Sequence, residues 1–246
     1  MKALGIYESL PVNDPECFVE FEKDKPVPGP RDLIVKVKAV SVNPVDTKVR
    51  RRITGRLVTP KILGWDASGI VEQIGAGVTL FKPGDEVYYA GDITRDGTDS
   101  EYHAVDERIA GRKPGSLSFK QAAAMPLTTI TAWEALFERL GAPKTAHNSG
   151  QSILIIGGAG GVGSIAIQLS KKVAGLKVIA TASRKDSAAW CRSLGADIVI
   201  DHTKPFREEL SRTGEKDVRY ILCLNSTESH LKNMADVIKP QGRICT

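Results

Sequence analysis

The sequence of 246 residues contains no long apolar run. A membrane-spanning helix needs roughly 18 apolar residues, and a secretory leader needs an apolar segment after its basic start, which the stretch behind Lys2 does not supply. Cysteine is scarce, and its four residues lie far apart without a C-x-x-C pair. This spacing argues against a disulfide framework and against a small zinc knuckle. We therefore expect a cytoplasmic protein with reduced thiols and no membrane partner.

The excess of positive charge is small, and it is unevenly distributed along the chain. The net charge is +5, and the whole excess lies in residues 123–246. A nucleic-acid-binding surface would more often gather Lys and Arg on one face with aromatic residues between them, so we expect no nucleic-acid partner. The densest basic run, from Lys48 to Arg56, is typical of a solvated loop. A small anionic ligand fits the excess better.

A cluster of glycines follows an apolar run of strand length at residues 153–156. Gly158, Gly160 and Gly163 match G-x-G-x-x-G, in which the glycines allow a tight turn, close approach of the backbone to a pyrophosphate, and close packing of a helix on a strand. Apolar residues then recur at three- and four-residue spacing, which predicts a helix whose free N–H groups and dipole point at a bound diphosphate. These residues are Val162, Ile165, Ala166, Leu169 and Val173. The alternative is a glycine-rich turn before an ordinary helix.

The two halves of the sequence differ in their expected secondary structure. Residues 1–122 contain short alternating strands separated by turns, which is typical of a small β-rich domain. Ser118 and Gln121 predict a capped short helix that ends at Met125-Pro126, near the join between domains. In residues 123–246, strands and helices alternate, which predicts an α/β fold with a parallel sheet covered by helices on both faces. The strands are expected at 33–39, 71–74, 86–89, 153–156, 177–182, 197–201, 218–224 and near 242, and the later helices at about 129–140, 162–173, 186–194, 205–211 and 227–238.

The sequence ends at Thr246, inside the fifth expected strand of this sheet. Dinucleotide-binding sheets usually have six strands, so we expect an incomplete sheet of about five parallel strands. An unpaired edge strand favours association with another copy, and a homodimer is therefore one arrangement that we expect.

The cofactor preference depends on the end of the second strand of the sheet. An NAD-binding sheet usually has an Asp or Glu there, about twenty residues after the glycines, to accept hydrogen bonds from the ribose 2′-hydroxyl. This chain has Ser183, Arg184 and Lys185 instead. The planar fork of Arg suits a phosphate, so we predict NADPH as the cofactor. In the alternative interpretation, Ser183 caps the next helix with Asp186, and Arg184 is solvated.

Four motifs carry a family resemblance. They are residues 41–48 (SVNPVDTK), 63–69 (LGWDASG), 82–85 (KPGD) and 157–163 (GGAGGVG). Together they resemble the medium-chain dehydrogenase/reductase superfamily, specifically its quinone oxidoreductases, in the branch often labelled zinc-type alcohol dehydrogenase-like. The resemblance implies a GroES-like catalytic domain, residues 1–122, followed by a Rossmann domain, residues 123–246. It also implies that family members continue past Thr246, with a last Rossmann strand and a segment that returns to the catalytic domain.

The sequence departs from the zinc enzymes of that superfamily at their metal ligands. Asn43 stands where those enzymes place a ligating Cys, and Trp65 stands in place of the His of Gly-His-Glu. Neither side chain is a normal zinc ligand, and the four-cysteine lobe of a structural zinc is missing. The four histidines, at positions 103, 147, 202 and 230, are scattered, and we interpret them as surface or hydrogen-bonding residues. We therefore predict no metal site.

The resemblance also implies site residues. Asn43 and Lys48 are the candidate catalytic donors beside the nicotinamide, and Asp46 is expected to hold their loop. Many quinone reductases have Tyr at the position of Lys48, which is equally well a surface lysine. Thr128 and Asn225 match family contacts to the cofactor, or else cap the helices that follow them. The other expected cofactor-binding residues are Gly158, Gly160, Gly161, Val162, Gly163, Ser183, Arg184 and Lys185.

Without a metal ion to polarise a carbonyl group, the substrate must itself be electron-poor. Quinones and α,β-unsaturated carbonyl compounds meet this condition. We therefore predict an NADPH-dependent oxidoreductase that reduces such compounds by hydride transfer. The alternatives are a 2-enoyl thioester reductase, and a nucleotide-binding protein with little catalysis because its C-terminal segment is missing.

Overall fold

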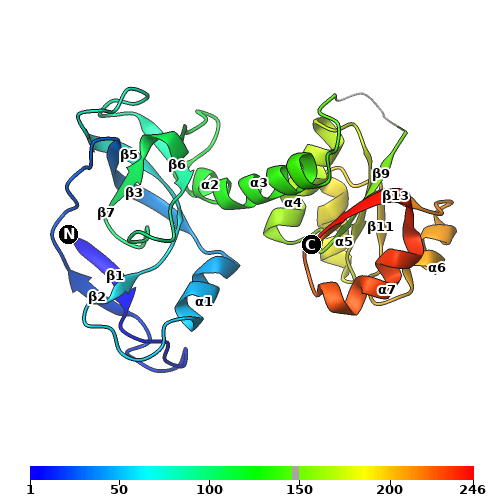
Figure 1. Ribbon diagram of the computed structural model, residues 1–246, viewed down its shortest axis with the longest axis horizontal. Helices are drawn as coiled ribbons and strands as arrows, with labels where there is room; N and C mark the ends of the chain where they lie inside the picture. Colours follow the sequence, from blue (N-terminus) through cyan, green and yellow to red (C-terminus); the bar gives the residue numbers. More distant parts are fainter. Residues whose placement is uncertain (146–149) are drawn as a thin grey trace. The chain divides into compact units, whose positions relative to one another are not determined.

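A computed structural model describes residues 1–145 and 150–246, and the chain forms two compact units, Met1–Leu127 and Thr128–Thr246 (Figure 1). The sequence places the join after residue 122, whereas the first unit continues to Leu127. The reason is that the short helix α2 (Phe119–Ala123) packs against strands of the first unit. No helix in the described ranges is long and apolar enough to cross a bilayer.

The first unit is built on a five-stranded antiparallel sheet. Its strand order is β7 (Tyr102–Asp106), β3 (Asp32–Ser41), β5 (Asp66–Ile74), β6 (Glu86–Ala90) and β8 (Ala110–Arg112). The strands that the sequence predicts at 33–39, 71–74 and 86–89 are confirmed as parts of β3, β5 and β6. Leu33 and Val35 of β3 are fully buried, and so is Ile34 between them. Because successive side chains of a strand point to opposite faces, this end of β3 is covered on both faces.

A smaller sheet and one helix complete the first unit. The sheet has the order β2 (Val19–Glu22), β1 (Lys2–Ile6) and β4 (Lys61–Ile62), and the helix α1 (Pro44–Arg51) follows β3. Val45 and Val49 of α1 pack against a cluster that contains the buried Ile6 and Trp65. Pro44 suits the first helical position, because the N–H that it lacks would have no partner within the helix.

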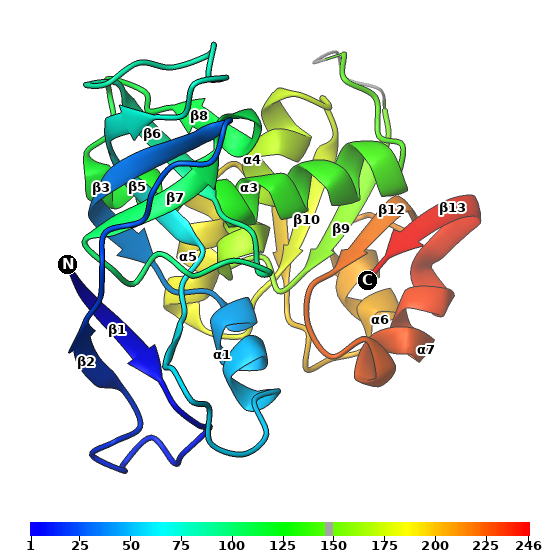
Figure 2. The same ribbon diagram turned by 60° about the vertical axis from the view of Figure 1, so that its left-hand side comes forward.

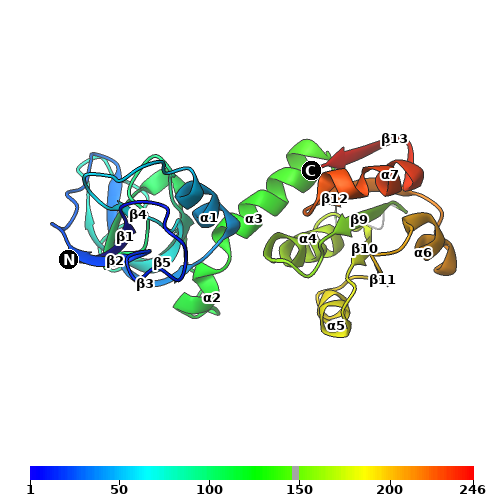
Figure 3. The same cartoon turned by 90° about the horizontal axis from the view of Figure 1, so that it is seen from below.

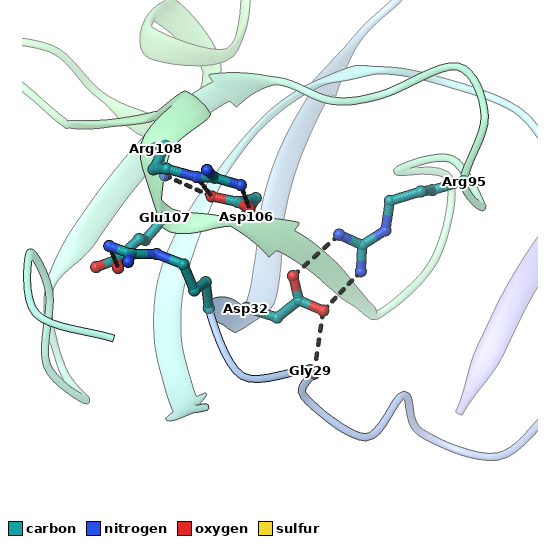
Figure 4. Close-up of polar contacts among 7 residues, drawn as sticks. Gly29, Asp32, Arg95, Asp106, Glu107 and Arg108 are labelled. Carbon is teal, nitrogen blue, oxygen red and sulfur yellow. Dashed lines mark hydrogen bonds and ion pairs between the residues drawn. The ribbon is translucent and has the colours of Figure 1, made fainter. Parts of the chain in front are cut away.

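Ion pairs fasten the loops around the start of β3 (Figure 4). Arg95 binds both carboxylate oxygens of Asp32, at 3.0 and 2.8 Å, and the N–H of Gly29 donates to the same carboxylate at 3.1 Å. The Arg95 guanidinium holds the pKa of Asp32 below its ordinary value. Arg31 donates to the buried carboxylate of Glu107 at 2.7 Å, and Glu107 begins the 3₁₀ helix Glu107–Ile109. These contacts join β3 to the segment after β7 and to the loop that carries Arg95.

The second unit is a parallel five-stranded sheet. Helices cover both faces of this sheet (Figures 2 and 3). The strand order is β11 (Ile198–Ile200), β10 (Lys177–Thr181), β9 (Ser152–Ile156), β12 (Val218–Cys223) and β13 (Ile238–Cys245). Alternate residues of β9 belong to two separate cores. One core includes side chains of α4 (Gly161–Lys172) and α5 (Lys185–Ser193), and the other includes side chains of α6 (Phe206–Arg212) and α7 (Thr227–Val237). The predicted α/β fold is confirmed, and the strand order is that of a dinucleotide-binding sheet.

The helix before the glycines differs from its prediction. The sequence predicts a helix over about 129–140 with Ile130, Trp133, Phe137 and Leu140 on one side. The helix α3 (Pro126–Trp133) begins earlier, and Phe137 and Leu140 are buried as expected, but Ile130 and Trp133 are 56% and 39% exposed. The short helix α2 ends before Met125-Pro126, as predicted, and Pro126 also begins α3, because a missing N–H is no loss in the first turn. A π-helix (Glu134–Arg139) then changes the spacing of the buried positions. The buried side consists of Ala132, Ala135, Leu136, Phe137 and Leu140.

Candidate functional site

The glycine-rich loop connects β9 to α4, as the sequence predicts. A Cβ atom on Gly163 would lie 2.4 Å from the carbonyl oxygen of Gly157 and 2.7 Å from that of Gly158, so only glycine lets α4 pack this closely on the end of the strand. A Cβ atom on Gly158 would lie 2.8 Å from the Cβ of Ala180. Gly160 differs, because it is exposed and its Cβ would come no closer than 3.4 Å to a neighbour. Packing therefore requires two of the three glycines, and the third leaves the loop surface free of a side chain.

Backbone N–H groups gather at the start of α4. A hydrogen bond of 2.8 Å runs from the N–H of Ser164 to the C=O of Gly160, the residue before the helix. The N–H groups of Gly161, Val162 and Gly163 lie before this bond, at the end of the helix that carries the positive pole of the dipole. The first turn contains no acidic residue. This helix start can therefore bind an anionic group.

Three other segments lie beside the loop within this unit. The hydroxyl of Thr181, at the end of β10, accepts the N–H of Gly157 at 3.1 Å. The Cγ2 atom of Thr128 lies 3.1 Å from the place that a Cβ on Gly161 would take, and the Cβ of Asn225 lies 3.7 Å from the corresponding place on Gly157. The structure therefore brings Thr128 and Asn225 against the glycine loop at the carboxyl end of the sheet.

The residues predicted to bind a 2′-phosphate follow β10 directly. Ser183, Arg184 and Lys185 are all exposed. The alternative that Ser183 caps the next helix is wrong, because α5 begins at Lys185 and its N-cap residue is Arg184. The Arg184 guanidinium donates to Ser187 Oγ through Nε and Nη2, both at 3.4 Å. These contacts are long, so the fork of Arg184 has no strong partner that an anion would have to displace.

Asn43, Asp46 and Asp66 form a buried polar cluster in the first unit. The N–H of Asn43 donates to Asp46 Oδ2 at 2.5 Å and fastens the turn that begins α1. The carboxamide Nδ2 of Asn43, which we expected to donate toward a substrate, donates to Asp66 Oδ2 at 2.8 Å instead. The other carboxylate oxygen of Asp66 accepts the N–H of Leu127 at 2.9 Å.

Burial changes the acidity of these carboxyl groups. Burial, with a smaller contribution from the negative charge of Asp46, raises the pKa of Asp66 to about 6, although hydrogen bonds from Asn43 and Leu127 oppose the change. Burial also raises the pKa of Asp46, whose Oδ1 has no hydrogen-bond partner in the described part of the chain. The pKa of Asp99 rises to about 6 for the same reason. Two carboxyl groups of this region therefore titrate near pH 6.

Lys48 lies on the exposed side of α1. It forms no hydrogen bond or ion pair with any residue that the structure describes, so its ammonium group is available to bind a ligand.

Trp65 occupies the second of the two positions that hold zinc ligands in the zinc enzymes. Its side chain is 1% exposed, and its Nε1 donates to the C=O of Asp92 at 3.1 Å. Within residues 1–145 and 150–246, no group of three or more His, Cys, Asp or Glu could hold a metal ion.

The histidines lie apart from these clusters. His103 is buried, and its ring nitrogens lie 3.1 Å from the hydroxyl of Tyr89 and 3.0 Å from the C=O of Asp96. Burial lowers the pKa of His103 to about 4, so the ring is neutral at physiological pH. His202 and His230 lie edge to face, with ring centroids 6.2 Å apart. The fourth histidine, His147, lies outside the described residues.

Three contacts of the site are not visible in the sequence. Asp66 binds residues 23 and 61 positions away, and Thr181 binds Gly157 from 24 positions away. Local patterns carry no information on such pairs. The one available signal is an Asp at the start of an apolar strand, where a carboxylate without partners would be costly to bury.

Comparison with known proteins identifies the family. Residues 29–134 match the family described as the alcohol dehydrogenase GroES-like domain, and residues 161–246 match the family described as zinc-binding dehydrogenase. A zinc-type alcohol dehydrogenase-like protein of Staphylococcus epidermidis is 42% identical over 247 residues, which cover all of this chain and 73% of that protein. The chain belongs to the medium-chain dehydrogenase/reductase superfamily. It is thus an oxidoreductase of that superfamily, with the GroES-like and Rossmann architecture that the sequence predicts.

Other members of the superfamily resemble this dehydrogenase/reductase along most of its length. A putative zinc-dependent alcohol dehydrogenase from Rhizobium etli has a TM-score of 0.92 and 50% identity, covering 100% of this chain and 71% of its own. The Escherichia coli quinone oxidoreductase complexed with NADPH has a TM-score of 0.80 and 28% identity, covering 99% and 72%. A chloroplastic NADPH-dependent alkenal/one oxidoreductase of Arabidopsis thaliana is 38% identical over 189 residues, which are 72% of this chain and 47% of that protein.

Proposed function

We propose that this chain is an NADPH-dependent reductase that transfers hydride to quinones or α,β-unsaturated carbonyl compounds without a metal ion. The observation that carries the proposal concerns the two ligand positions of the zinc enzymes. Asn43 donates to Asp66 and Trp65 donates to the C=O of Asp92, so both side chains are bonded within the protein, and neither is a normal zinc ligand. Two relatives support the choice of reaction: one was solved with NADPH, and one is named for alkenals and enones.

The second unit fits a dinucleotide. The N–H groups of residues 161–163 would bind the diphosphate, and Gly160 leaves the loop surface open to its approach. Thr128 and Asn225 border the same loop and would contact the cofactor beyond the diphosphate. NADPH, when bound, supplies the hydride, and the protein supplies its position.

A preference for NADPH over NADH follows from the end of β10. Ser183, Arg184 and Lys185 offer a hydroxyl and two cations at an exposed place where NAD-binding sheets usually have a carboxylate. Arg184 would donate two parallel charge-assisted bonds to the 2′-phosphate. A hydrogen bond to a charged group contributes about 1.5 to 3 kcal/mol, which is enough to decide the preference.

The group that activates the substrate would come from the first unit. Hydride addition to a quinone or an enone places negative charge on an oxygen atom through conjugation, so a single donor can stabilise it. Lys48 is the donor that we propose, because its ammonium group is exposed and unpaired among the described residues. Asn43 and Asp46 are bonded at the start of α1, and they contribute by holding the helix that carries Lys48.

A turnover assay tests the proposal. Purified protein is assayed with NADPH against a naphthoquinone, a small enone and an enoyl thioester, and with NADP⁺ against ethanol. We expect reduction of the quinone or the enone and no oxidation of ethanol. Lys48→Ala should lower kcat more than it raises KM, by up to about a hundredfold, whereas the exposed Lys38→Ala should behave like the wild type.

Robust ethanol oxidation would contradict the metal-free reductase. Reduction of the thioester alone would favour a 2-enoyl thioester reductase. Binding of NADPH without turnover of any substrate would favour a nucleotide-binding protein.

A further inference from the structure

Asp66 lies at the point where two helices begin. It is the first residue of β5, and it is 0% exposed. Its Oδ2 accepts the carboxamide nitrogen of Asn43, the residue before α1, at 2.8 Å. Its Oδ1 accepts the N–H of Leu127, the second residue of α3, at 2.9 Å. Each carboxylate oxygen therefore holds the N-terminus of a different helix.

These contacts are the kind that an ionised carboxylate makes. A helix N-terminus presents N–H donors and the positive end of the dipole, and both favour a negative charge. Both partners of the Asp66 side chain are donors, and an oxygen that carries a proton is a weaker acceptor than a carboxylate oxygen. Protonation of Asp66 would therefore weaken one of the two contacts.

The charged groups that act on Asp66 are acidic. Asp46, on α1, accepts the N–H of Asn43, and its negative charge raises the pKa of Asp66. The pKa of Asp99, in the loop between β6 and β7, is raised by burial and, to a smaller extent, by the same negative charge of Asp46. The residues paired with Asp66 are Ser41 on β3 and Ala90 on β6, and neither carries a charge. Within the described ranges no cation forms an ion pair with Asp66, so its support comes from the two helix starts.

We propose that Asp66 is a positioning residue, whose carboxylate fixes the start of α1 and thereby places Lys48 for the reaction. The placement matters for catalysis only under the proposed function, because α1 carries the candidate donor Lys48. Asp66 acts through this helix and through Asn43, the residue before it.

The proposal makes turnover depend on the ionisation of Asp66. Because burial raises the pKa of this carboxyl group to about 6, kcat should fall as the pH drops through that value. An Asn side chain at this position has one carbonyl oxygen and can accept from only one of the two donors. Asp66→Asn should therefore lower kcat by about ten- to a hundredfold at high pH and should remove the fall near pH 6.

The experiment is a profile of kcat against pH for the full chain, with NADPH and a naphthoquinone. Asp99→Asn is the matched control, because burial raises the pKa of Asp99 to about 6 as well, although no hydrogen bond links its side chain to Asn43 or Leu127 in the described structure. We expect Asp99→Asn to keep the fall near pH 6 and Asp66→Asn to lose it. A fall that persists in Asp66→Asn, or that disappears in Asp99→Asn, overturns the proposal.

A double-mutant cycle separates positioning from a general loss of stability. If Asp66 acts through Asn43, adding Asp66→Asn to Asn43→Ala should cost less activity than Asp66→Asn costs alone. Losses that multiply would show that the two residues act independently, and would overturn the role of Asn43 as the link.

A readout without turnover separates this proposal from the proposed function. The side-chain amide signals of Asn43, followed by NMR in the wild-type chain, should titrate with a midpoint near pH 6, and the step should vanish in Asp66→Asn. If no quinone or enone is reduced but the Asn43 signals titrate, the proposed function fails while the Asp66 contact stands. If turnover is found and the Asn43 signals do not respond, Asp66 is not the positioning residue.

Discussion

Alanine at Gly160 should impair cofactor binding without harming the fold, whereas alanine at Gly163 should harm the fold. Gly160 has φ −72° and ψ 173°, a conformation that alanine adopts without strain, and its Cβ would come no closer than 3.4 Å to a neighbour. Alanine also lowers the conformational entropy of the unfolded chain. The free energy of unfolding of Gly160→Ala should therefore stay within about 1 kcal/mol of the wild-type value.

Gly163 has no such room. Its Cβ would lie 2.4 and 2.7 Å from two backbone carbonyl oxygens, distances far shorter than normal van der Waals contact. Either α4 or the loop must move to relieve the overlap. Overpacking of this kind costs about 1 to 3 kcal/mol, so Gly163→Ala should lower the free energy of unfolding by roughly that amount.

The effect of Gly160→Ala on binding follows from the position of the methyl group. It would stand on the loop surface, where the glycine motif brings the backbone close to a pyrophosphate. Losing one hydrogen bond to a charged phosphate costs about 1.5 to 3 kcal/mol. The affinity for NADPH should therefore fall about ten- to a hundredfold.

Denaturation by urea measures the first effect, and an NADPH titration followed by tryptophan fluorescence measures the second. Trp190 is a suitable reporter, because its indole N–H donates to Ser164 Oγ in α4 at 2.9 Å and the residue is 50% exposed. Unchanged NADPH affinity in Gly160→Ala would refute the placement of the diphosphate. Unchanged stability in Gly163→Ala would refute the packing role of that glycine.

Three further predictions concern charge and metal. Arg184→Glu should weaken NADPH binding about ten- to a hundredfold and spare NADH, as measured by calorimetric titration, and equal affinities in the unmutated protein would contradict the 2′-phosphate assignment. Elemental analysis should find no stoichiometric zinc, because Asn43 and Trp65 occupy the ligand positions; one zinc per chain that survives a chelator would count against this. The unfolded chain loses the Asp66 proton near pH 3.8 and the folded chain near pH 6, so between these values rising pH should cost the wild type about 3 kcal/mol of unfolding free energy relative to Asp66→Asn. Urea denaturation at several pH values measures this difference, and a constant difference would show that the pKa of Asp66 is not raised.

The second unit was predictable from the sequence because its signals are local. An apolar run, three glycines and a helical pattern stand next to one another in residues 153–173, and the structure forms β9, the loop and α4 from them. The expected end of α5 is confirmed in the same way, since Gly195 follows the helix with φ +109°. The first core of this unit also contains Ile167, which the predicted apolar face of α4 did not include.

Features that depend on distant partners were not predictable. The start of α3 at Pro126 is stabilised by the carboxylate of Asp66, which lies on a strand of the first unit. The π-helix that follows has no marker in the local spacing of apolar residues. The hydrogen bond from Asn43 to Asp66 likewise arises only when the sheet pairs β5 with β3, because β3 ends two residues before Asn43 and Ser41 lies opposite Asp66. Local sequence therefore showed which residues could take part, and the fold decides what each of them contacts.

The central claim is that hydride passes from NADPH to an electron-poor acceptor without help from a metal ion. Its most direct test uses NADPH deuterated at the transferred position of the dihydronicotinamide, a small enone, and NMR to locate the deuterium in the product. We expect the deuterium on the carbon β to the carbonyl group, because conjugation carries the negative charge from that attack onto oxygen, where a single donor suffices. Deuterium on the carbonyl carbon of an allylic alcohol would contradict the claim, since direct attack there needs the polarisation that a metal ion ordinarily supplies.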